Sequence, residues 1–286
     1  MNWFLADLRE TAEKEQVMKN GTSGKRMSFR QKTCIMVLSI YFFIAAFAPL
    51  IMPYEVTDFS HPSLAEPCRQ YLLGTDEMGH DIFSLLIYGF RLTVCMALAA
   101  GFFSTLTGTV LAFCACYLGK AADHVITMTA DLFIIVPEMV IVMFAAVFAE
   151  PTMINTELAI ILFSWPRVYK IIRGKLKDCM NSSKVQYTMM MKGSIADVLQ
   201  KLMPDIMPSV QTYFILQTNK AVTYETTLSF FGIGDPLAKT WGKLIRAAMD
   251  YENLYYDRVF LWYFIPVILV VVVFVVSLAL LVHGGE

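Results

Sequence analysis

Four ionisable side chains lie inside stretches of the sequence that are otherwise strongly apolar: Asp131, Glu138, Lys220 and Glu225. Burying a charge in hydrocarbon costs at least about 2.5 kcal/mol on insertion scales, so each group must pair with an opposite charge or meet water. Asp131 and Glu138 are seven residues apart and fall on nearly the same face of one helix, while Lys220 and Glu225 are five apart. The sequence leaves three interpretations open: internal ion pairs, the lining of a transport pathway, or an ion relay.

The sequence has none of the familiar patterns of catalytic or metal-binding residues. Its four histidines are dispersed without an HExxH or other paired spacing, and it contains no GxSxG nucleophile turn. The stretch GTSGK (residues 21–25) lacks the upstream glycine spacing and the following Ser/Thr of a phosphate-binding loop. We therefore do not expect an enzyme, and we expect no catalytic residues, no metal site and no cofactor bound by this chain.

The composition places the chain in a membrane. Hydrophobic residues make up 57% of the sequence, charged residues only 16%, and the mean hydropathy is +0.55. These values lie outside the usual range of soluble domains. We expect an all-α polytopic membrane protein in contact with lipid. The net charge of −1 gives no indication of a nucleic-acid partner, and none is expected.

Apolar segments predict about six transmembrane helices. The first, residues 33–53, follows an amphipathic N-terminal segment, residues 1–32. A signal peptide is the competing interpretation, but the apolar run is too long for one and no small-residue cleavage site follows it. The other predicted spans are approximately residues 92–119, 125–149, 152–172, 206–231 and 259–282. The last of these has no charged residue, and its length suffices to cross a hydrocarbon core of about 30 Å.

The distribution of basic residues predicts the orientation. With six spans and both termini in the cytoplasm, 16 of the 23 Lys/Arg lie inside and five outside, whereas the opposite orientation inverts this ratio. The segment 1–32 is then cytoplasmic and the acidic segment 54–83 extracellular. Residues 84–286 form the transmembrane domain, which contains a cytoplasmic loop at residues 167–205 with eight Lys/Arg.

This loop has a predicted secondary structure of its own. The stretch from Lys184 to Lys192 can form a helix that Gly193 breaks. Ser194 is a plausible N-cap for a second helix, which Pro204 is expected to end. One face of that helix is apolar, formed by Ile195, Val198, Leu199 and Leu202. Such a face suits either a protein partner or the ends of the protein's own helices.

Four motifs in order along the chain resemble one family of membrane proteins. They are LLGTDEMGHDIFSLLIYGFRLTV (72–94), CYLGKAADHVITMTADLFIIVP (116–137), WPRVYKIIRG (165–174) and ETTLSFFGIGDPLAKTWGKLIRAA (225–248). Together they resemble the integral membrane subunit of binding-protein-dependent ABC importers, specifically the second, C-type permease of the dipeptide, oligopeptide and nickel group. The stretch KVQYTMMMKG (184–193) differs from the family, which has an acidic residue and an alanine pair ahead of the glycine.

The resemblance implies a fold, a location and partners. The fold is that of a type I importer permease in a prokaryotic cell membrane. A second permease completes a heterodimer, two cytosolic ATPase subunits use ATP and Mg²⁺, and an external binding protein delivers peptides, nickel or a metal chelate. The loop would couple to the ATPase through Lys184, Gly193, Ser194, Ile195, Val198, Leu199, Leu202 and Pro204. An ion-coupled secondary transporter or channel that acts without an ATPase remains the alternative.

Overall fold

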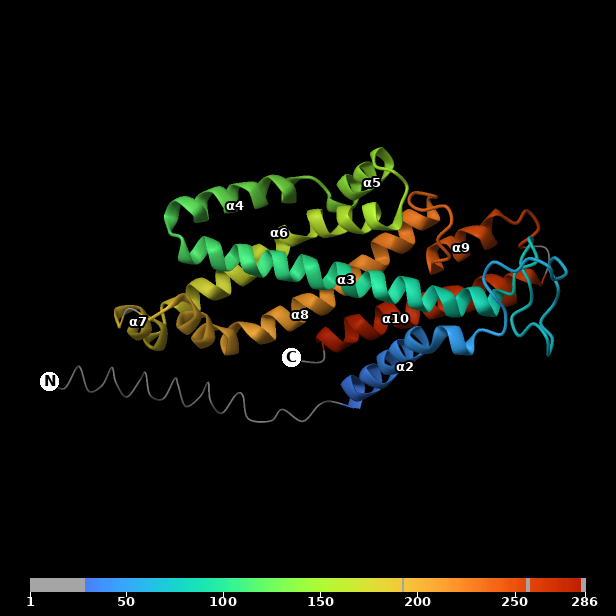
Figure 1. Ribbon diagram of the computed structural model, residues 1–286, viewed down its shortest axis with the longest axis horizontal. Coiled ribbons are helices and arrows are strands. Elements are labelled where there is room, and N and C mark those ends of the chain that lie inside the picture. Colours follow the sequence, from blue (N-terminus) through green and yellow to red (C-terminus); the bar gives the residue numbers. More distant parts are fainter. Residues whose placement is uncertain (1–28, 192, 256–257, 284–286) are drawn as a thin grey trace.

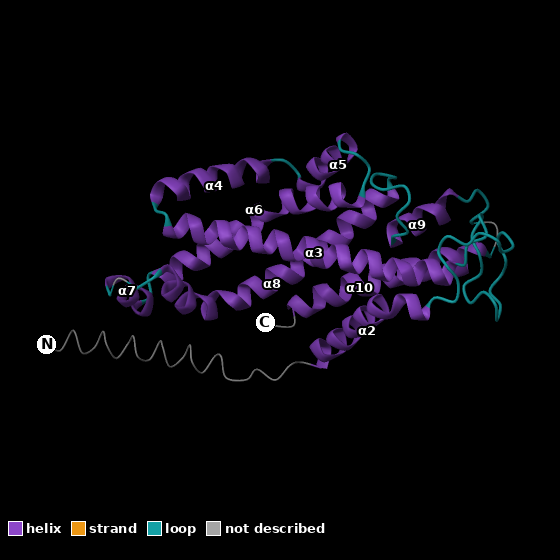
Figure 2. Cartoon of the chain, viewed as in Figure 1, coloured by secondary structure: helices purple, strands orange, loops and turns teal. Residues whose placement is uncertain are grey.

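The computed structural model describes residues 29–191, 193–255 and 258–283, so most of the predicted amphipathic segment 1–32 lies outside the described residues. Within these ranges the chain is built of helices joined by loops (Figures 1 and 2). The helices are α2 (Phe29–Ile51), α3 (Ile82–Tyr117), α4 (Lys120–Ile135), α5 (Glu138–Phe148), α6 (Met153–Met180), α7 (Ser183–Met190), α8 (Ile195–Phe230), α9 (Trp241–Asp250), the π-helix η1 (Phe260–Phe264) and α10 (Ile265–His283).

The expected all-α polytopic fold is confirmed. Three described helical segments are long and apolar enough to cross a membrane, namely residues 29–51, 82–117 and 260–282. A fourth candidate is the pair α4 and α5, which is bent by 85°. The bend falls at Pro137, which has no N–H to continue a helix, so the span predicted at residues 125–149 is a pair of helices and not one continuous helix. The two remaining predicted spans, at residues 152–172 and 206–231, lie within the more polar helices α6 and α8, of 28 and 36 residues.

Helix α3 is the centre of the packing (Figure 1) and makes its most extensive contacts with α6 and α8. Two glycines of α3 allow these close crossings. A Cβ at Gly101 would lie 2.9 Å from the backbone nitrogen of Thr218 on α8, and one at Gly108 would lie 2.9 Å from the carbonyl oxygen of Trp165 on α6. Small residues at such positions let membrane helices approach each other closely, which maximises their van der Waals contact.

The long helices run roughly along the longest axis of the molecule (Figure 1). The loop at residues 52–81, which joins α2 to α3, lies at one end together with α9. Helix α7 lies at the opposite end, where α6 finishes and α8 begins. We refer to these as the loop end and the α7 end. The chain therefore presents two distinct surfaces separated by the full length of its helices.

Helix α8 continues through Pro204 and Pro208, so the prediction that Pro204 ends a short helix is wrong. Leu202 and Ile206 lie one turn apart on either side of Pro204 and are 0% and 1% exposed. Burial of two large aliphatic side chains offsets a proline penalty of about 3 kcal/mol. The second helix of the predicted loop and the fifth predicted span are thus one continuous helix.

Candidate functional site

Glu138 is the centre of a buried charge cluster formed by α5, α6 and α8. Its Oε1 atom accepts hydrogen bonds from Lys220 Nζ at 2.7 Å and from the Ser164 hydroxyl at 2.6 Å. Its Oε2 atom lies 3.7 Å from Nε of Arg167. Glu138 also begins α5, where the partial positive charge of the helix N-terminus stabilises a carboxylate. Two of the four predicted intramembrane charges, Glu138 and Lys220, are therefore paired with each other across 82 positions of sequence.

Two acidic residues of α4 pair with basic residues of α6. Asp131 Oδ1 lies 2.5 Å from Nζ of Lys170, and this pair is about half exposed. Nearer the α7 end, Asp123 pairs with Arg173 and, at 2.8 Å, with Lys177. Helix α6 runs antiparallel to α4 and α5. The acidic residues 123, 131 and 138 therefore pair with the basic residues 173, 170 and 167, in that order. Asp131 and Glu138 do not share a helix face as expected, because the helix breaks between them.

Glu225 lies apart from this cluster. Its side chain is buried, and its Oε1 atom accepts a hydrogen bond from the Ser229 hydroxyl at 2.7 Å. Its Oε2 atom is buried without a partner among the described residues. Lys220 pairs with Glu138 and not with its sequence neighbour Glu225. In the described chain, Asp131, Glu138 and Glu225 thus belong to three separate sets of contacts.

Ser194 caps α8, as the sequence predicts. Its hydroxyl accepts a hydrogen bond from the Asp197 N–H at 3.2 Å, while the Ser194 N–H donates to Asp197 Oδ2 at 2.7 Å. This reciprocal arrangement is a capping box and satisfies backbone donors that a helix N-terminus leaves unpaired. Hydrogen bonds from the hydroxyl and the backbone of Ser194 lower the pKa of Asp197. The carboxylate therefore stays charged, and the cap intact, at neutral pH.

Gly193 and Lys184 hold α7 against α8. The Gly193 N–H donates to the Thr188 carbonyl at 2.9 Å, and a Cβ at this position would lie 2.7 Å from Cγ2 of Thr188. Only glycine fits this tight turn without displacing its neighbour. Lys184 Nζ lies 2.5 Å from Asp205 Oδ2, which adjoins the exposed Pro204. These predicted docking residues have contacts within the chain itself.

The apolar face predicted for the start of α8 is divided between two environments. Val198 and Leu202 are 1% and 0% exposed and pack in a cluster with Val185 of α7. Ile195 and Leu199 are 52% and 37% exposed. Packing on the protein's own helices therefore accounts for half of the face. The other half joins a set of exposed apolar side chains that we call the α7 surface: Tyr187, Met189, Met190, Met191, Ile195 and Leu199.

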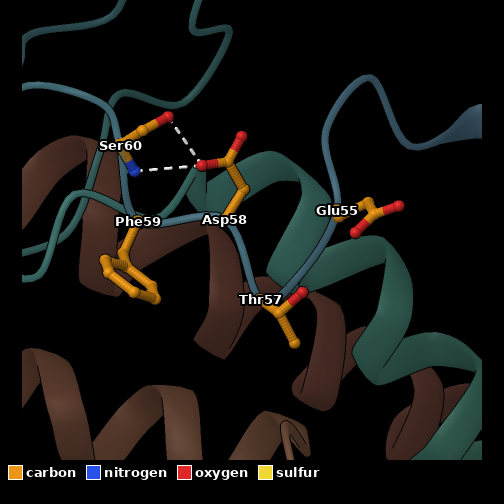
Figure 3. A pocket seen from close by; sticks show the side chains of 5 residues that line it. All are labelled: Glu55, Thr57, Asp58, Phe59 and Ser60. Carbon is orange, nitrogen blue, oxygen red and sulfur yellow. Dashed lines mark hydrogen bonds between the residues drawn. The ribbon is translucent and has the colours of Figure 1, made fainter.

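A pocket opens at the other end of the molecule, in the loop between α2 and α3 (Figure 3). It is lined by Glu55, Thr57, Asp58, Phe59 and Ser60. Asp58 Oδ1 accepts hydrogen bonds from the backbone N–H of Ser60 at 3.0 Å and from its hydroxyl at 2.6 Å. These bonds, that of the hydroxyl first, lower the pKa of Asp58. The pocket therefore has a negative charge at neutral pH.

Sequence reasoning missed Arg167 and Lys170 as partners of the intramembrane acids, because it assigned both to the end of the fourth span, where the cytoplasmic loop begins. The structure places them on α6, beside Glu138 and Asp131. A signal was present in the sequence. Acidic residues at 123, 131 and 138 precede basic residues at 167, 170, 173 and 177 in the following helix. Two antiparallel helices can bring such series together, and burial in a membrane favours that pairing.

The fold and these charge clusters define a multi-pass helical membrane protein in which ion pairs hold polar spans together and an apolar surface projects at one end. A model of the family described as "Binding-protein-dependent transport system inner membrane component" matches residues 104–283. The chain belongs to this family. It is a permease subunit of an ABC importer in a bacterial membrane. Family membership decides against the alternative of a carrier or channel without an ATPase.

Curated relatives match most of the chain. The di/tripeptide transport system permease protein DppC of Pseudomonas aeruginosa is 26% identical, over 76% of this chain and 75% of its own length. The dipeptide transport system permease protein DppC of Haemophilus influenzae is 28% identical, over 72% and 74%. The glutathione transport system permease protein GsiD of Pectobacterium atrosepticum is also 28% identical, over 72% and 69%. The predicted resemblance to C-type peptide permeases is confirmed.

Proposed function

We propose that this chain imports peptides as one half of a heterodimeric permease. The relatives named above are permeases for di/tripeptides, dipeptides and glutathione, which favours a short peptide over nickel or a metal chelate. Two cytosolic ATPase subunits supply the energy from ATP and Mg²⁺, and an external binding protein delivers the peptide. This chain contributes transmembrane helices and a coupling surface and performs no hydrolysis itself.

The observation that supports ATPase coupling most directly is the exposure of the α7 surface. Met190 and Met191 are 79% and 67% exposed, and Tyr187 is 66% exposed. Methionine side chains adapt to the shape of a partner, so this run suits a groove on another protein. Beneath the surface, buried Val198 and Leu202 anchor the start of α8. Force applied at the α7 surface would therefore move α8, a helix of 36 residues, as a rigid body.

The proposed orientation puts the α7 end and both termini in the cytoplasm. The excess of Lys/Arg in the segments assigned to this side supports that orientation. The loop end then faces outward, and its acidic pocket at Asp58 lies on the side where a binding protein arrives. The two proposed partner surfaces are at opposite ends of the long helices (Figure 1).

Co-purification tests this proposal. The tagged chain is expressed with its neighbouring transporter subunits, extracted in mild detergent, and scored for a second permease and an ATPase. We expect Leu199→Asp to remove the ATPase but keep the permease, because it places a charge on the exposed part of the α7 surface. Gln200→Asp is the matched control. It adds the same charge at the next, also exposed position, outside the apolar face, and should keep both partners.

Two results would contradict the proposal. One is equal ATPase recovery from Leu199→Asp and wild type, which would remove the α7 surface as the coupling site. The other is a chain that, purified alone, moves peptide into liposomes without ATP.

A further inference from the structure

The charge cluster around Glu138 contains one more cation than anion. Lys220 lies 2.7 Å from Glu138 Oε1 and already neutralises this carboxylate. Arg167 approaches only the other oxygen, at 3.7 Å, which is too long for a hydrogen bond. Among the described residues, Glu138 is its one ion-pair partner. The Arg167 guanidinium, which has five N–H donors, is thus left with one long ion-pair contact.

Arg167 lies near the middle of the 28-residue helix α6 and not in the cytoplasmic loop that the sequence predicted to begin there. Its partner Glu138 lies at the break between α4 and α5, a bent pair that is long and apolar enough to be one candidate span. On α6, Arg167 is fourteen residues from Met153, or about 21 Å along the helix axis. Its side chain is nevertheless 63% exposed. An exposed guanidinium at this depth is too costly to face hydrocarbon, so this side of α6 must face water or protein.

The neighbouring charges indicate that this side of α6 borders a water-filled path. Lys170 lies one helical turn from Arg167, on the same face, and its ion pair with Asp131 is also about half exposed. Charged groups within membrane spans pair with one another, face the interior of the helix bundle or line an aqueous cavity, and they mark the pathways of substrates and ions. The path for substrate through a permease is such a cavity.

We propose that Arg167 binds the terminal carboxylate of a peptide as the peptide crosses the membrane. The proposal rests on the proposed peptide substrate and adds the chemical group that is recognised. A planar guanidinium matches a carboxylate through two parallel N–H···O bonds, and the surplus positive charge of the cluster favours an anion. Between substrates, Glu138 holds the guanidinium in place without saturating its donors. Binding forms and breaks only hydrogen bonds and ion pairs.

The test compares import of one tripeptide with a free carboxylate and of the same tripeptide with a C-terminal amide. The complete transporter is reconstituted in proteoliposomes with ATP and its binding protein. We expect Arg167→Gln to lower the acid-to-amide import ratio about tenfold relative to wild type, the effect of losing one strong charged hydrogen bond. The binding protein can itself prefer one of the two peptides, but it is the same in both transporters. Its preference therefore does not affect the comparison of the variant's ratio with that of wild type. Lys175→Gln is the control, which removes an exposed cation about two turns further along α6, outside the proposed path, and should leave the ratio unchanged.

A second measurement needs no variant. In the wild-type transporter, the rate at which phenylglyoxal modifies Arg167 is followed by mass spectrometry. The acid peptide should slow this modification and the amide should not. Equal protection by both peptides would overturn the proposal, as would an Arg167→Gln variant that imports both peptides less by the same factor. A wild-type transporter that imports neither peptide would instead refute the proposed function, and this inference with it.

Discussion

Ion pairs between distant residues organise the membrane-spanning part of this chain. Glu138 meets Lys220 and Arg167, and Asp131 meets Lys170. The sequence predicted that the intramembrane charges need partners, because that requirement follows from the cost of a charge in lipid. It did not predict which partners, since nearby residues such as Lys220 and Glu225 were the obvious candidates. The true pairing depends on which helices cross, and this is decided by packing elsewhere in the molecule.

Breaking the Glu138–Lys220 pair should destabilise the protein strongly. We expect Glu138→Gln to lower the free energy of unfolding by about 3–5 kcal/mol, because it leaves the buried Lys220 without an anion and beside a second cation, Arg167. Lys220→Met should cost less, because Arg167 remains beside Glu138. The double variant should cost less than the sum of the two. Asp131→Asn is the control, since its half-exposed pair with Lys170 is expected to contribute at most about 1 kcal/mol. Unfolding in detergent measures all four, and strictly additive effects would show that the pair is not coupled.

At the scale of elements, local signals in the sequence predicted where helices begin better than where they end. Ser194 caps α8 as expected, because a capping box depends only on residues three apart. Pro204 was expected to end that helix, yet burial of Leu202 and Ile206 on both sides carries the helix through it. The bend at Pro137 shows the opposite outcome for the same residue type. Whether a proline ends a helix is thus decided by tertiary contacts that the local sequence does not contain.

Two glycines should respond in opposite ways to the same substitution. Gly108→Ala places a Cβ 2.7 Å from Cβ of Val168 and 2.9 Å from the Trp165 carbonyl, so α3 and α6 must separate. We expect a loss of about 1–3 kcal/mol in stability. Gly174→Ala, on α6, meets nothing within 4 Å and should gain up to about 1 kcal/mol through helix propensity. Melting temperatures of the two purified variants give the signs, and a stable Gly108→Ala protein would refute the close crossing.

The loop end and the α7 end lie at opposite ends of the molecule, and the proposed function assigns them to different partners: the binding protein and the ATPase. Composition and hydropathy predicted the membrane, the helices and most of the spans, because these depend on summed transfer energies and not on individual contacts. The division of the apolar face at the start of α8 was beyond the sequence. Val198 and Ile195 are both apolar residues on the same predicted helix face, so the sequence does not distinguish them. The position of α7 buries Val198 and leaves Ile195 exposed. The α7 surface is therefore a product of tertiary structure.

Orientation is the whole-molecule property that labelling can decide. Cys68 is exposed in the loop at residues 52–81, and Met190 is exposed on α7, at the opposite end. We expect a membrane-impermeant maleimide to label Cys68 in intact spheroplasts, because the positive-inside rule places the acidic loop outside. In a variant with Met190→Cys and the native cysteines replaced by serine, labelling should require permeabilisation. Labelling of the denatured protein gives the maximum for each cysteine. A cysteine that is labelled only after denaturation is covered by a partner and does not report the orientation. The reverse pattern would invert the orientation and place the α7 surface where no cytosolic ATPase can reach it.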